Sequence, residues 1–307
     1  MSIFSGMWVP LITPFADGAV DHAALRALVR RYAGAGIAGL VALGTTGEPA
    51  ALNAAEQDAV LATILDEAQA AARHPHDARA LPVLVGVSGN HTASMRERIE
   101  QLNPLPIAGV LMAAPYYIRP SQAGIVEHFT ALADASAKPV VLYDIPYRTG
   151  VRLELDTLFA LAAHPRIQAV KDCAGSLDIT LALIRDGRLQ VLAGEDINIF
   201  NTLCLGGSGA IAASAHVRTE RFVALYRTLA AGRLDEGRRI FHALAPLIQT
   251  LFAEPNPAPV KALLAAQGLI RDELRMPMTR SGGALRERLA ALAERERSEA
   301  QETEASV

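Results

Sequence analysis

Lys171 is the residue of this sequence best suited to covalent chemistry. It is one of only three lysines among 29 basic residues, and it closes the apolar run Ile167-Gln168-Ala169-Val170. A lysine amine becomes a nucleophile toward carbonyl carbon when its surroundings lower its pKa, whereas arginine stays charged and inert. We predict that Lys171 forms a Schiff base, the alternative being a strand-end lysine in a solvated loop. The other two lysines, Lys138 and Lys261, are interpreted as ordinary surface or helix-end residues.

Three further groups with useful chemistry follow apolar runs of the same kind. The turn Gly44-Thr45-Thr46-Gly47 offers hydroxyl and N–H groups that suit a carboxylate or a proton relay, the alternative being a purely structural turn. Tyr143 follows the run 140–142, where its hydroxyl suits a general acid or base, the alternative being a core tyrosine. Arg148 lies in the next loop, where a guanidinium suits bidentate binding of a carboxylate, the alternative being a surface ion pair.

Eight short apolar runs alternate with stretches of helical spacing. The runs cover residues 8–12, 39–43, 82–87, 107–112, 139–142, 167–170, 190–193 and 209–212. Helical stretches lie between most of them, at 23–32, 54–72, 121–137, 155–163 and 177–185. This pattern predicts a (β/α)8 TIM barrel, with a doubly wound open sheet as the alternative. A barrel would bring the lysine, the tyrosine, the threonine turn and the arginine to one mouth, because the carboxyl ends of its strands meet there.

The ends of the predicted helices carry suitable capping residues. The expected starts are Asp21, Asn53, Ser121 and Ser176, and the expected stops are Gly34, Gly36 and Gly187. After residue 212 only helical patterns remain, at 221–231, 235–252, 259–267 and 284–293. We therefore predict a barrel with the active site at 1–231, a C-terminal helical extension at 232–294, and a disordered, charged tail at 295–307.

The composition excludes several functional classes. The chain is 51% hydrophobic with a net charge of −3 and no basic cluster, which argues against binding to nucleic acid or an anionic membrane. No apolar stretch approaches the ~18 residues of a membrane span, and the two cysteines, Cys173 and Cys204, are predicted to be unpaired, so a cytoplasmic location is expected. The His74-Pro75-His76-Asp77 loop has no second group of ligands nearby, and no metal site is predicted.

Seven short motifs run along the chain in a fixed order. They are GTTGE at 44–48, PYY-x-RPSQ-x-G at 115–124, Y-x-x-P-x-RTG at 143–150, the strand-end Lys171, GED at 194–196, EPNP at 254–257 with VK at 260–261, and LRMPM at 274–278. Together they resemble the dihydrodipicolinate synthase / N-acetylneuraminate lyase family of pyruvate-dependent class I aldolases, over residues 3–288. The resemblance implies a TIM barrel that needs no external cofactor, because a covalent lysine–pyruvate Schiff base carries the chemistry.

The resemblance also implies a role for each matching residue. Lys171 would form the imine with pyruvate, and Thr45, Tyr143 and Tyr117 would relay protons, with Tyr117 entering the site of a neighbouring subunit. Thr46, together with Thr45, would hold the pyruvate carboxylate. The backbones of Gly194 and Ile211 would line the pocket. A borrowed tyrosine requires at least a dimer, and the family is usually tetrameric, so a homotetramer is expected.

Arg148 favours the synthase branch of the family, in which this arginine binds the carboxylate of L-aspartate 4-semialdehyde. The product would be 4-hydroxy-tetrahydrodipicolinate, on the route to diaminopimelate and lysine. The chain departs from the usual K-E-A-T-G, with Asp172 and Cys173 after the lysine, and Tyr147 replaces a small residue. One alternative is therefore an aldolase or dehydratase acting on a 2-keto-3-deoxy sugar acid or an N-acetylneuraminate-like substrate. Another is a catalytically inactive barrel that serves as a regulator or scaffold.

The family's lysine-feedback site also differs in this sequence. A histidine and a glutamate that help bind lysine in inhibited bacterial relatives match Ala54 and Ser94, whereas Asn90 and Tyr116 are retained. Without the carboxylate, the ammonium group of a bound lysine loses its charge partner. Weak or absent inhibition by lysine is predicted.

Overall fold

Eight parallel strands close into a barrel. The structure, a computed structural model, describes residues 3–71 and 80–305. Around the barrel the strands follow the order β1-β10-β9-β8-β7-β6-β5-β4, and β4 pairs with β1 to close it. Their bounds are β1 Gly6–Pro10, β4 Gly39–Ala42, β5 Val83–Val87, β6 Gly109–Ala113, β7 Val140–Asp144, β8 Ile167–Asp172, β9 Gln190–Ala193 and β10 Gly209–Ile211. The predicted TIM barrel is confirmed, and the open sheet is wrong.

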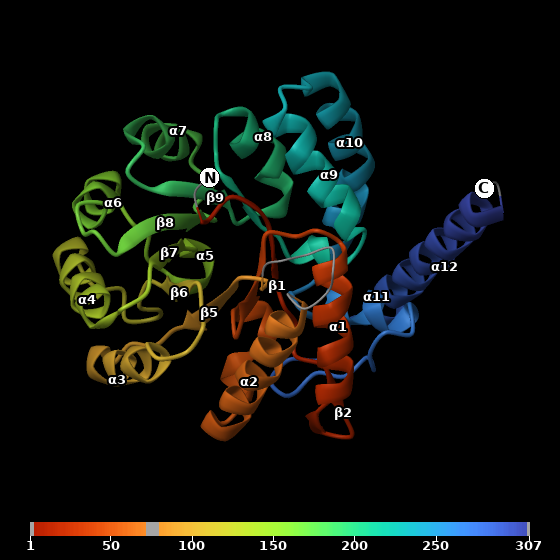
Figure 1. The fold of residues 1–307 in the computed structure, drawn as a ribbon, viewed down its shortest axis with the longest axis horizontal. Helices are drawn as coiled ribbons and strands as arrows, with labels where there is room; N and C mark the ends of the chain where they lie inside the picture. Colours follow the sequence, from red (N-terminus) through yellow and green to blue (C-terminus); the bar gives the residue numbers. More distant parts are fainter. Residues whose placement is uncertain (1–2, 72–79, 306–307) are drawn as a thin grey trace.

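Helices surround the barrel, as Figure 1 shows. They are α1 His22–Gly34, α2 Ala54–Ala71, α3 Thr92–Leu102, α4 Gln122–Ala135, α6 Leu155–Leu161, α7 Leu177–Asp186, α8 Ile199–Cys204 and α9 Thr219–Ala230. A short helix, α5 Pro146–Thr149, follows β7 at the mouth. A two-stranded hairpin, β2 Phe15–Ala16 and β3 Ala19–Val20, lies between β1 and α1 in the sequence.

Local sequence explains where several of these helices begin and end. At the start of α2, Asn53 accepts a hydrogen bond from the Glu56 N–H (2.9 Å) and the Glu56 carboxylate accepts one from the Asn53 N–H (3.0 Å), which is a capping box. Asp21 caps α1 through its side chain. Ser176 precedes α7 as predicted, although its side chain makes no capping bond. Gly187 ends α7 with a φ of 75°, a conformation that glycine adopts without strain.

The barrel has its own core, separate from the core between strands and helices. The side chains that fill the interior are those of Phe4, Trp8, Val41, Leu84, Leu111, Val141, Tyr143, Ile145, Ala169, Cys173, Leu192 and Ile211. Trp8 is the largest of them and is completely buried. A Cβ on Gly39 would collide with its ring, so glycine on the neighbouring strand makes room for the indole. The interior is a packed core rather than a channel, and polar chemistry is confined to its mouth.

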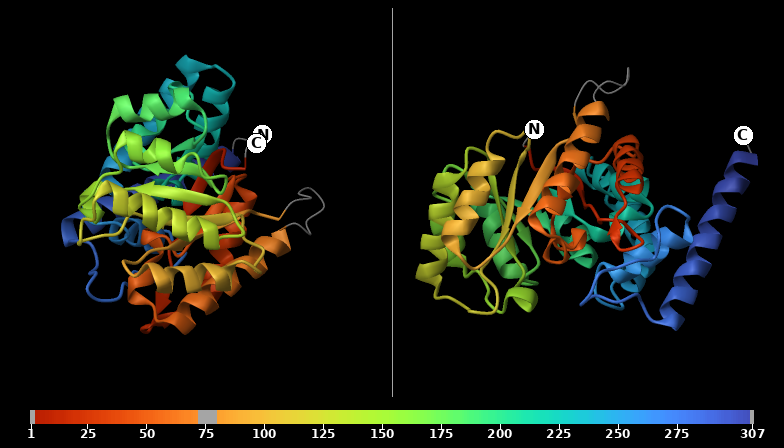
Figure 2. Two further views of the ribbon diagram at one scale, coloured as in Figure 1. Left: turned by 90° about the vertical axis from the view of Figure 1, so that its left-hand side faces the viewer. Right: turned by 90° about the horizontal axis from the view of Figure 1, so that it is seen from below.

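The C-terminal helices lie against one side of the barrel. They are α10 Leu234–Leu251, α11 Ala258–Ala266 and α12 Gly283–Ala305, and α10 packs on α9. Figure 2 shows α12 at the end of the molecule opposite α3 and α4. We predicted that the last helix would end at Ala293, but α12 continues to Ala305. The physical reason is that the charged tail is rich in alanine, glutamate, arginine and glutamine, which are strong helix formers even without apolar spacing.

Two features are absent from the described ranges, residues 3–71 and 80–305. No helix there has the length and apolar character to cross a membrane. No group of three or more histidine, cysteine, aspartate or glutamate side chains there could hold a metal ion. The His74-Pro75-His76-Asp77 loop falls outside these ranges. Cys173 and Cys204 are both free, as predicted, and the division into domains stays a prediction.

Candidate active site

Lys171 and Tyr143 lie side by side at the carboxyl ends of two neighbouring strands. They are register partners of β8 and β7. Side chains alternate along a strand, so both point into the barrel like Ala169 and Val141. Each is only 7% exposed, and Lys171 Nζ lies 4.3 Å from the centroid of the Tyr143 ring. The lysine is therefore held against an aromatic face inside the mouth and does not lie in a solvated loop.

Gly194 provides the space that Lys171 occupies. It directly follows β9, and its N–H donates to the carbonyl of Asp172 at 2.9 Å. A Cβ at this position would lie 2.8 Å from Lys171 Cγ and closer still to Cys173 Sγ. Any larger residue would displace the lysine side chain, so Gly194 lies directly beside Lys171, and its role in lining a pyruvate pocket stays a prediction.

A buried carboxyl group lies near the lysine. Asp196 is 2% exposed, and its Oδ2 accepts a hydrogen bond of 2.6 Å from the Ser214 N–H. Burial raises the pKa of Asp196 to about 6, while the hydrogen bonds from Ser214 and the positive charge of Lys171 lower it. When ionised, Asp196 compensates part of the charge of the lysine.

Tyr143 connects the lysine to the threonine turn. Burial raises its pKa well above the usual value, and neighbouring Cys173 and Tyr147 act in the same direction. The charge of Arg148 and a side-chain hydrogen bond with Thr45 lower this pKa. The phenol therefore stays protonated near neutral pH, and its partner Thr45 is exposed at the mouth. Ile211, a predicted lining residue, belongs to the same interior cluster.

The threonine turn is held in place by residues from the C-terminal part of the chain. The Asn256 side chain donates a 2.9 Å hydrogen bond from Nδ2 to the hydroxyl of buried Thr46. Glu48 has a left-handed backbone, with φ 54° and ψ 42°, which costs an ordinary residue about 1–2 kcal/mol. Its carboxylate forms an ion pair with Lys261 on α11. The turn is thus fixed from outside the barrel, which allows a strained backbone to persist.

Lys261 corrects one interpretation made from the sequence. It is completely buried rather than a surface or helix-end lysine. Besides Glu48, its Nζ donates to the carbonyl of Glu273 at 3.0 Å and lies 4.1 Å from the centroid of the Phe15 ring. Burial lowers its pKa, and Glu48 raises it. A buried, paired cation of this kind is a structural element, because removing one partner leaves an uncompensated charge.

Arg148 belongs to a second cluster at the mouth. It lies on α5 and is exposed, with Cζ 5.7 Å from the centroid of the Tyr147 ring. The Tyr147 hydroxyl donates a hydrogen bond of 2.9 Å to Glu195 Oε1. Burial raises the pKa of Cys173 well above its usual value, and a hydrogen bond between its thiol and Glu195 adds to this rise. The mouth therefore holds a guanidinium and a carboxylate that both contact one tyrosine, Tyr147.

Tyr117 stands apart from the other predicted residues. It lies in the loop after β6, is 89% exposed, and has a φ of 71°. Its N–H donates to the carbonyl of Thr149 at 3.0 Å, which fixes the loop against the end of α5. Within one chain no contact joins Tyr117 to Tyr143 or Lys171 in the part of the molecule that the structure describes. The family resemblance implies that this tyrosine enters the site of a neighbouring subunit, and this stays a prediction; its exposure leaves it available for such a contact.

The outward faces of the same two strands carry a pair of aspartates. Asp144 and Asp172 are register partners on β7 and β8 and point away from the barrel interior. The Asp172 carboxylate accepts from Thr180, whereas Asp144 accepts a 3.2 Å bond from the Leu153 N–H. Burial raises the pKa of Asp144 to about 7, the Leu153 N–H lowers it, and the charge of Asp172 raises it further. Asp144 is therefore a buried group that titrates near neutral pH.

We expect Asp144→Asn to change how stability depends on pH. Between about pH 4 and 7 folded Asp144 keeps a proton that the unfolded chain has released, so the free energy of unfolding falls as pH rises. The amide stays neutral and still accepts from Leu153. The wild type should therefore lose on the order of 4 kcal/mol of its free energy of unfolding between pH 4 and pH 8 through this group, and the variant should not show this loss. Urea unfolding at both pH values checks this, with exposed Asp156→Asn as the control, and parallel pH profiles for all three proteins would contradict it.

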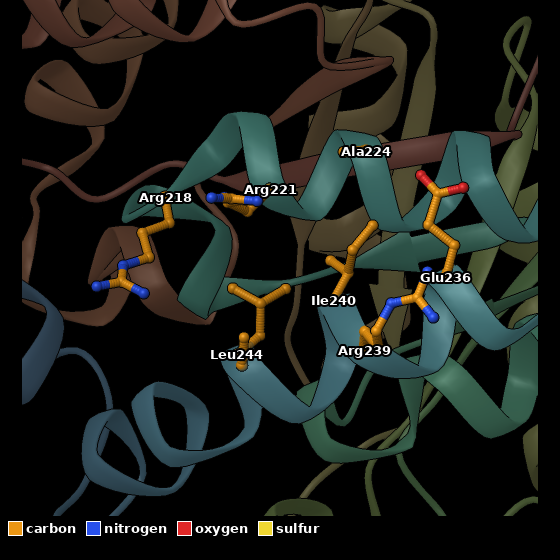
Figure 3. Close-up of a pocket in the computed structure, with 8 residues that line it drawn as sticks. Arg218, Arg221, Ala224, Glu236, Arg239, Ile240 and Leu244 are labelled. Carbon is orange, nitrogen blue, oxygen red and sulfur yellow. The ribbon is translucent and has the colours of Figure 1, made fainter. Parts of the chain in front are cut away.

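A separate cleft lies outside the barrel, between α9 and α10. It has a volume of about 440 Å³, and its lining includes Arg218, Arg221 and Arg239. Figure 3 shows the three arginines spread along the cleft and not converging on one point. None of the predicted catalytic residues lines it.

The sequence identified most of the mouth but missed two of its features. The structure brings Lys171, Tyr143, Thr45 and Gly194 together, and it leaves Tyr117 exposed. The contact between Tyr147 and Glu195 was not predicted, although both follow strand ends. The anchoring of the threonine turn by Asn256 and Lys261 was also not predicted. The only sequence signal for it is that both residues belong to the motif EPNP followed by VK.

A closed barrel of eight parallel strands, with polar groups gathered at the carboxyl ends of the strands, is the architecture of TIM-barrel enzymes. The model of the dihydrodipicolinate synthetase family matches residues 3–296. The chain belongs to this family, as the motifs indicated.

Named relatives cover nearly the whole chain. The 4-hydroxy-tetrahydrodipicolinate synthase 2 of Clostridium acetobutylicum is 39% identical over 287 residues, which are 92% of this chain and 97% of the relative. The corresponding synthase of Geobacter metallireducens is 35% identical over 94% of this chain and 98% of its own. The crystal structure of dihydrodipicolinate synthase from Aquifex aeolicus has a TM-score of 0.90 and 30% identity, over 96% of this chain and 98% of that one.

Proposed function

We propose that this protein is a lyase that condenses pyruvate with L-aspartate 4-semialdehyde to give 4-hydroxy-tetrahydrodipicolinate. The observation that carries the proposal is the placement of Lys171, buried against Tyr143 at the mouth of a barrel whose named relatives are 4-hydroxy-tetrahydrodipicolinate synthases. This reaction needs an amine nucleophile, a proton donor beside it and a carboxylate-binding group for the aldehyde. The mouth has a residue for each task.

In the proposed mechanism the amine of Lys171 attacks C2 of pyruvate and water leaves, which forms an iminium ion. The iminium accepts the electron pair of a methyl C–H bond as the proton departs, and the resulting enamine attacks the aldehyde carbon. Tyr143 and Thr45, already joined by a hydrogen bond, would carry protons to and from the reacting atoms, with Tyr117 of a neighbouring subunit as the third member. No external cofactor takes part in this scheme.

The remaining predicted residues would position the two substrates. Thr46, held by Asn256, and the neighbouring Thr45 would bind the pyruvate carboxylate. The backbones of Gly194 and Ile211 would line the pocket around the imine. Arg148 would bind the carboxylate of the aldehyde, since a guanidinium offers two parallel donors. We further propose that the protein self-associates, because exposed Tyr117 gains a function only against a second subunit. The proposed homotetramer and cytoplasmic location rest on the family resemblance.

One experiment tests the proposed function. The protein is incubated with pyruvate and borohydride, the adduct is located by mass spectrometry, and L-aspartate 4-semialdehyde is compared with sugar-acid aldehydes as the second substrate. We expect an adduct on Lys171 and turnover of the semialdehyde. A protein without an adduct would be an inactive barrel. An adduct combined with turnover of a sugar-acid aldehyde alone would favour the lyase or dehydratase alternative.

We expect Arg148→Ala to impair use of the aldehyde more than use of pyruvate. Loss of a charge-assisted, bidentate contact should raise the KM for the aldehyde by about 10- to 100-fold, while the KM for pyruvate changes little. Steady-state kinetics with each substrate varied in turn checks this, with Arg152→Ala in the next loop as the control. Equal losses for both substrates would contradict the assigned role.

We expect lysine to inhibit this protein weakly or not at all. A hollow of about 340 Å³ beside the threonine turn is lined by Asn90, Ser94 and Tyr116, and none of the described residues around it is acidic. The Asn90 and Ser94 side chains carry no charge for an ammonium group, and each already has a partner: Asn90 Nδ2 donates to the Tyr116 carbonyl at 3.0 Å, and Ser94 contacts His91. Initial rates at rising lysine concentration check this. Strong inhibition at submillimolar lysine would refute the prediction.

A further inference from the structure

Glu195 is a carboxylate held by two neighbours at the mouth of the barrel. It follows Gly194, the residue whose missing side chain makes room for Lys171. The Tyr147 hydroxyl donates to its Oε1 at 2.9 Å, and the thiol of buried Cys173 forms a hydrogen bond with it. Two contacts from two different strand-end segments fix the direction in which this carboxylate points.

The carboxylate still has capacity for a cation. Its two oxygens offer about four acceptor sites, and the two neighbours use only part of them. Among residues 3–71 and 80–305, no lysine, arginine or histidine forms an ion pair with Glu195, whereas buried Glu48 is paired with Lys261. Glu195 is also half-buried. A ligand in the mouth can therefore still reach it, and water screens its charge less than it would screen a fully exposed carboxylate.

A cation and an anion are therefore presented next to each other around Tyr147. The guanidinium of Arg148 lies near its ring, with Cζ 5.7 Å from the centroid, and Glu195 accepts from its hydroxyl. A ligand that carries only a carboxylate would use one of these charges and would be repelled by the other. A zwitterion of the α-amino acid type would use both.

We propose that Glu195 determines specificity by binding the ammonium group of an amino-acid aldehyde whose carboxylate lies on Arg148. Tyr147 and Cys173 are positioning residues, because they act through the carboxylate and not on the substrate. This inference rests on the proposed function, which supplies an aldehyde of this kind. The inference also assigns a role to Tyr147 and Cys173, which both contact Glu195 and at which the chain departs from the family's usual sequence.

The test compares two aldehydes that differ by one amino group. The kcat/KM for L-aspartate 4-semialdehyde and the inhibition constant of succinate semialdehyde, which lacks the amine, are measured with the pyruvate-loaded wild type and with Glu195→Gln. The amide can still accept from Tyr147, so the loop should keep its shape. We expect kcat/KM for the amino-aldehyde to fall by about 10- to 100-fold and succinate semialdehyde to bind as well as before or better.

Controls separate this inference from a structural role and from the proposed function. Tyr147→Phe should reproduce the same selective loss to a smaller degree, and Glu127→Gln, a change of an exposed carboxylate on α4, should leave both aldehydes unaffected. Equal weakening of both aldehydes by Glu195→Gln would overturn the inference, even where borohydride still traps pyruvate on Lys171. Failure of that trapping in the wild type would instead overturn the proposed function.

Discussion

Lys171→Arg is expected to abolish imine formation with pyruvate. Arginine keeps a positive charge over the Tyr143 ring, where Lys171 Nζ lies 4.3 Å from the centroid, but a guanidinium cannot lose a proton to attack a carbonyl. The expected result is no borohydride-trapped adduct and a loss of turnover greater than about 10⁴-fold, the scale seen when a covalent nucleophile is removed. Intact-mass measurement and a turnover assay check both parts.

The control for this substitution is Lys138→Arg, which makes the same change away from the barrel mouth and should keep full activity. Because Gly194 and Cys173 confine the Lys171 side chain, Lys171→Met serves as a second variant with less bulk. An adduct that persists in both variants would refute the assignment. Lys261 is a poor rival, since it is completely buried and paired with Glu48, although burial lowers its pKa as it would for a nucleophile.

The sequence was sufficient to predict the barrel and the inward direction of its key residues. Each apolar run became a strand, and the step of two from Ala169 to Lys171 shows that lysine shares the face of an interior residue. Once the strands alternate with helices, parallel pairing follows, and so does a common mouth. Tyr143 and Lys171 then lie side by side if β7 and β8 are neighbours in the barrel, which is expected because the two strands are consecutive in the chain.

Contacts between loops and the C-terminal helices could not be predicted in the same way. Lys261 pairs with Glu48, which lies more than 200 positions earlier in the chain. The residue spacing of the helix that carries Lys261 does not indicate this partner. Glu195 and Tyr147 meet because the segments after β9 and β7 come together at the mouth, and this depends on tertiary packing and not on local spacing. The helix α12 extends beyond its last predicted residue because propensity alone sustains it where apolar spacing is lacking.

The threonine turn shows how distant contacts serve the site. Its hydroxyls would hold a carboxylate only if the backbone keeps its shape, and that shape includes a left-handed Glu48. Asn256 bonded to Thr46 and Lys261 paired with Glu48 fix it from the helical extension. The C-terminal helices are therefore part of the architecture of the candidate site, which explains why motifs from both ends of the chain occur together.

Tyr143→Phe is expected to leave imine formation intact while slowing the steps that move protons. The ring remains, so the aromatic face beside Lys171 is kept, and only the hydroxyl that joins Thr45 is lost. Burial raises the pKa of Tyr143 well above its usual value, so the phenol is protonated at neutral pH and acts first as a donor. Removing a general acid or base typically slows a reaction by 10²–10⁴-fold, and we expect turnover to fall by about that factor.

Two measurements separate the proton relay from a structural role for this tyrosine. Borohydride trapping should still yield the pyruvate adduct on Lys171, whereas exchange of the pyruvate methyl protons with deuterated water should slow in step with turnover. Thr45→Val, which removes the partner hydroxyl at similar volume, should slow exchange in the same direction, because the Tyr143 hydroxyl then lacks its relay. Unchanged exchange with lost turnover would show that Tyr143 positions the aldehyde and does not transfer the proton.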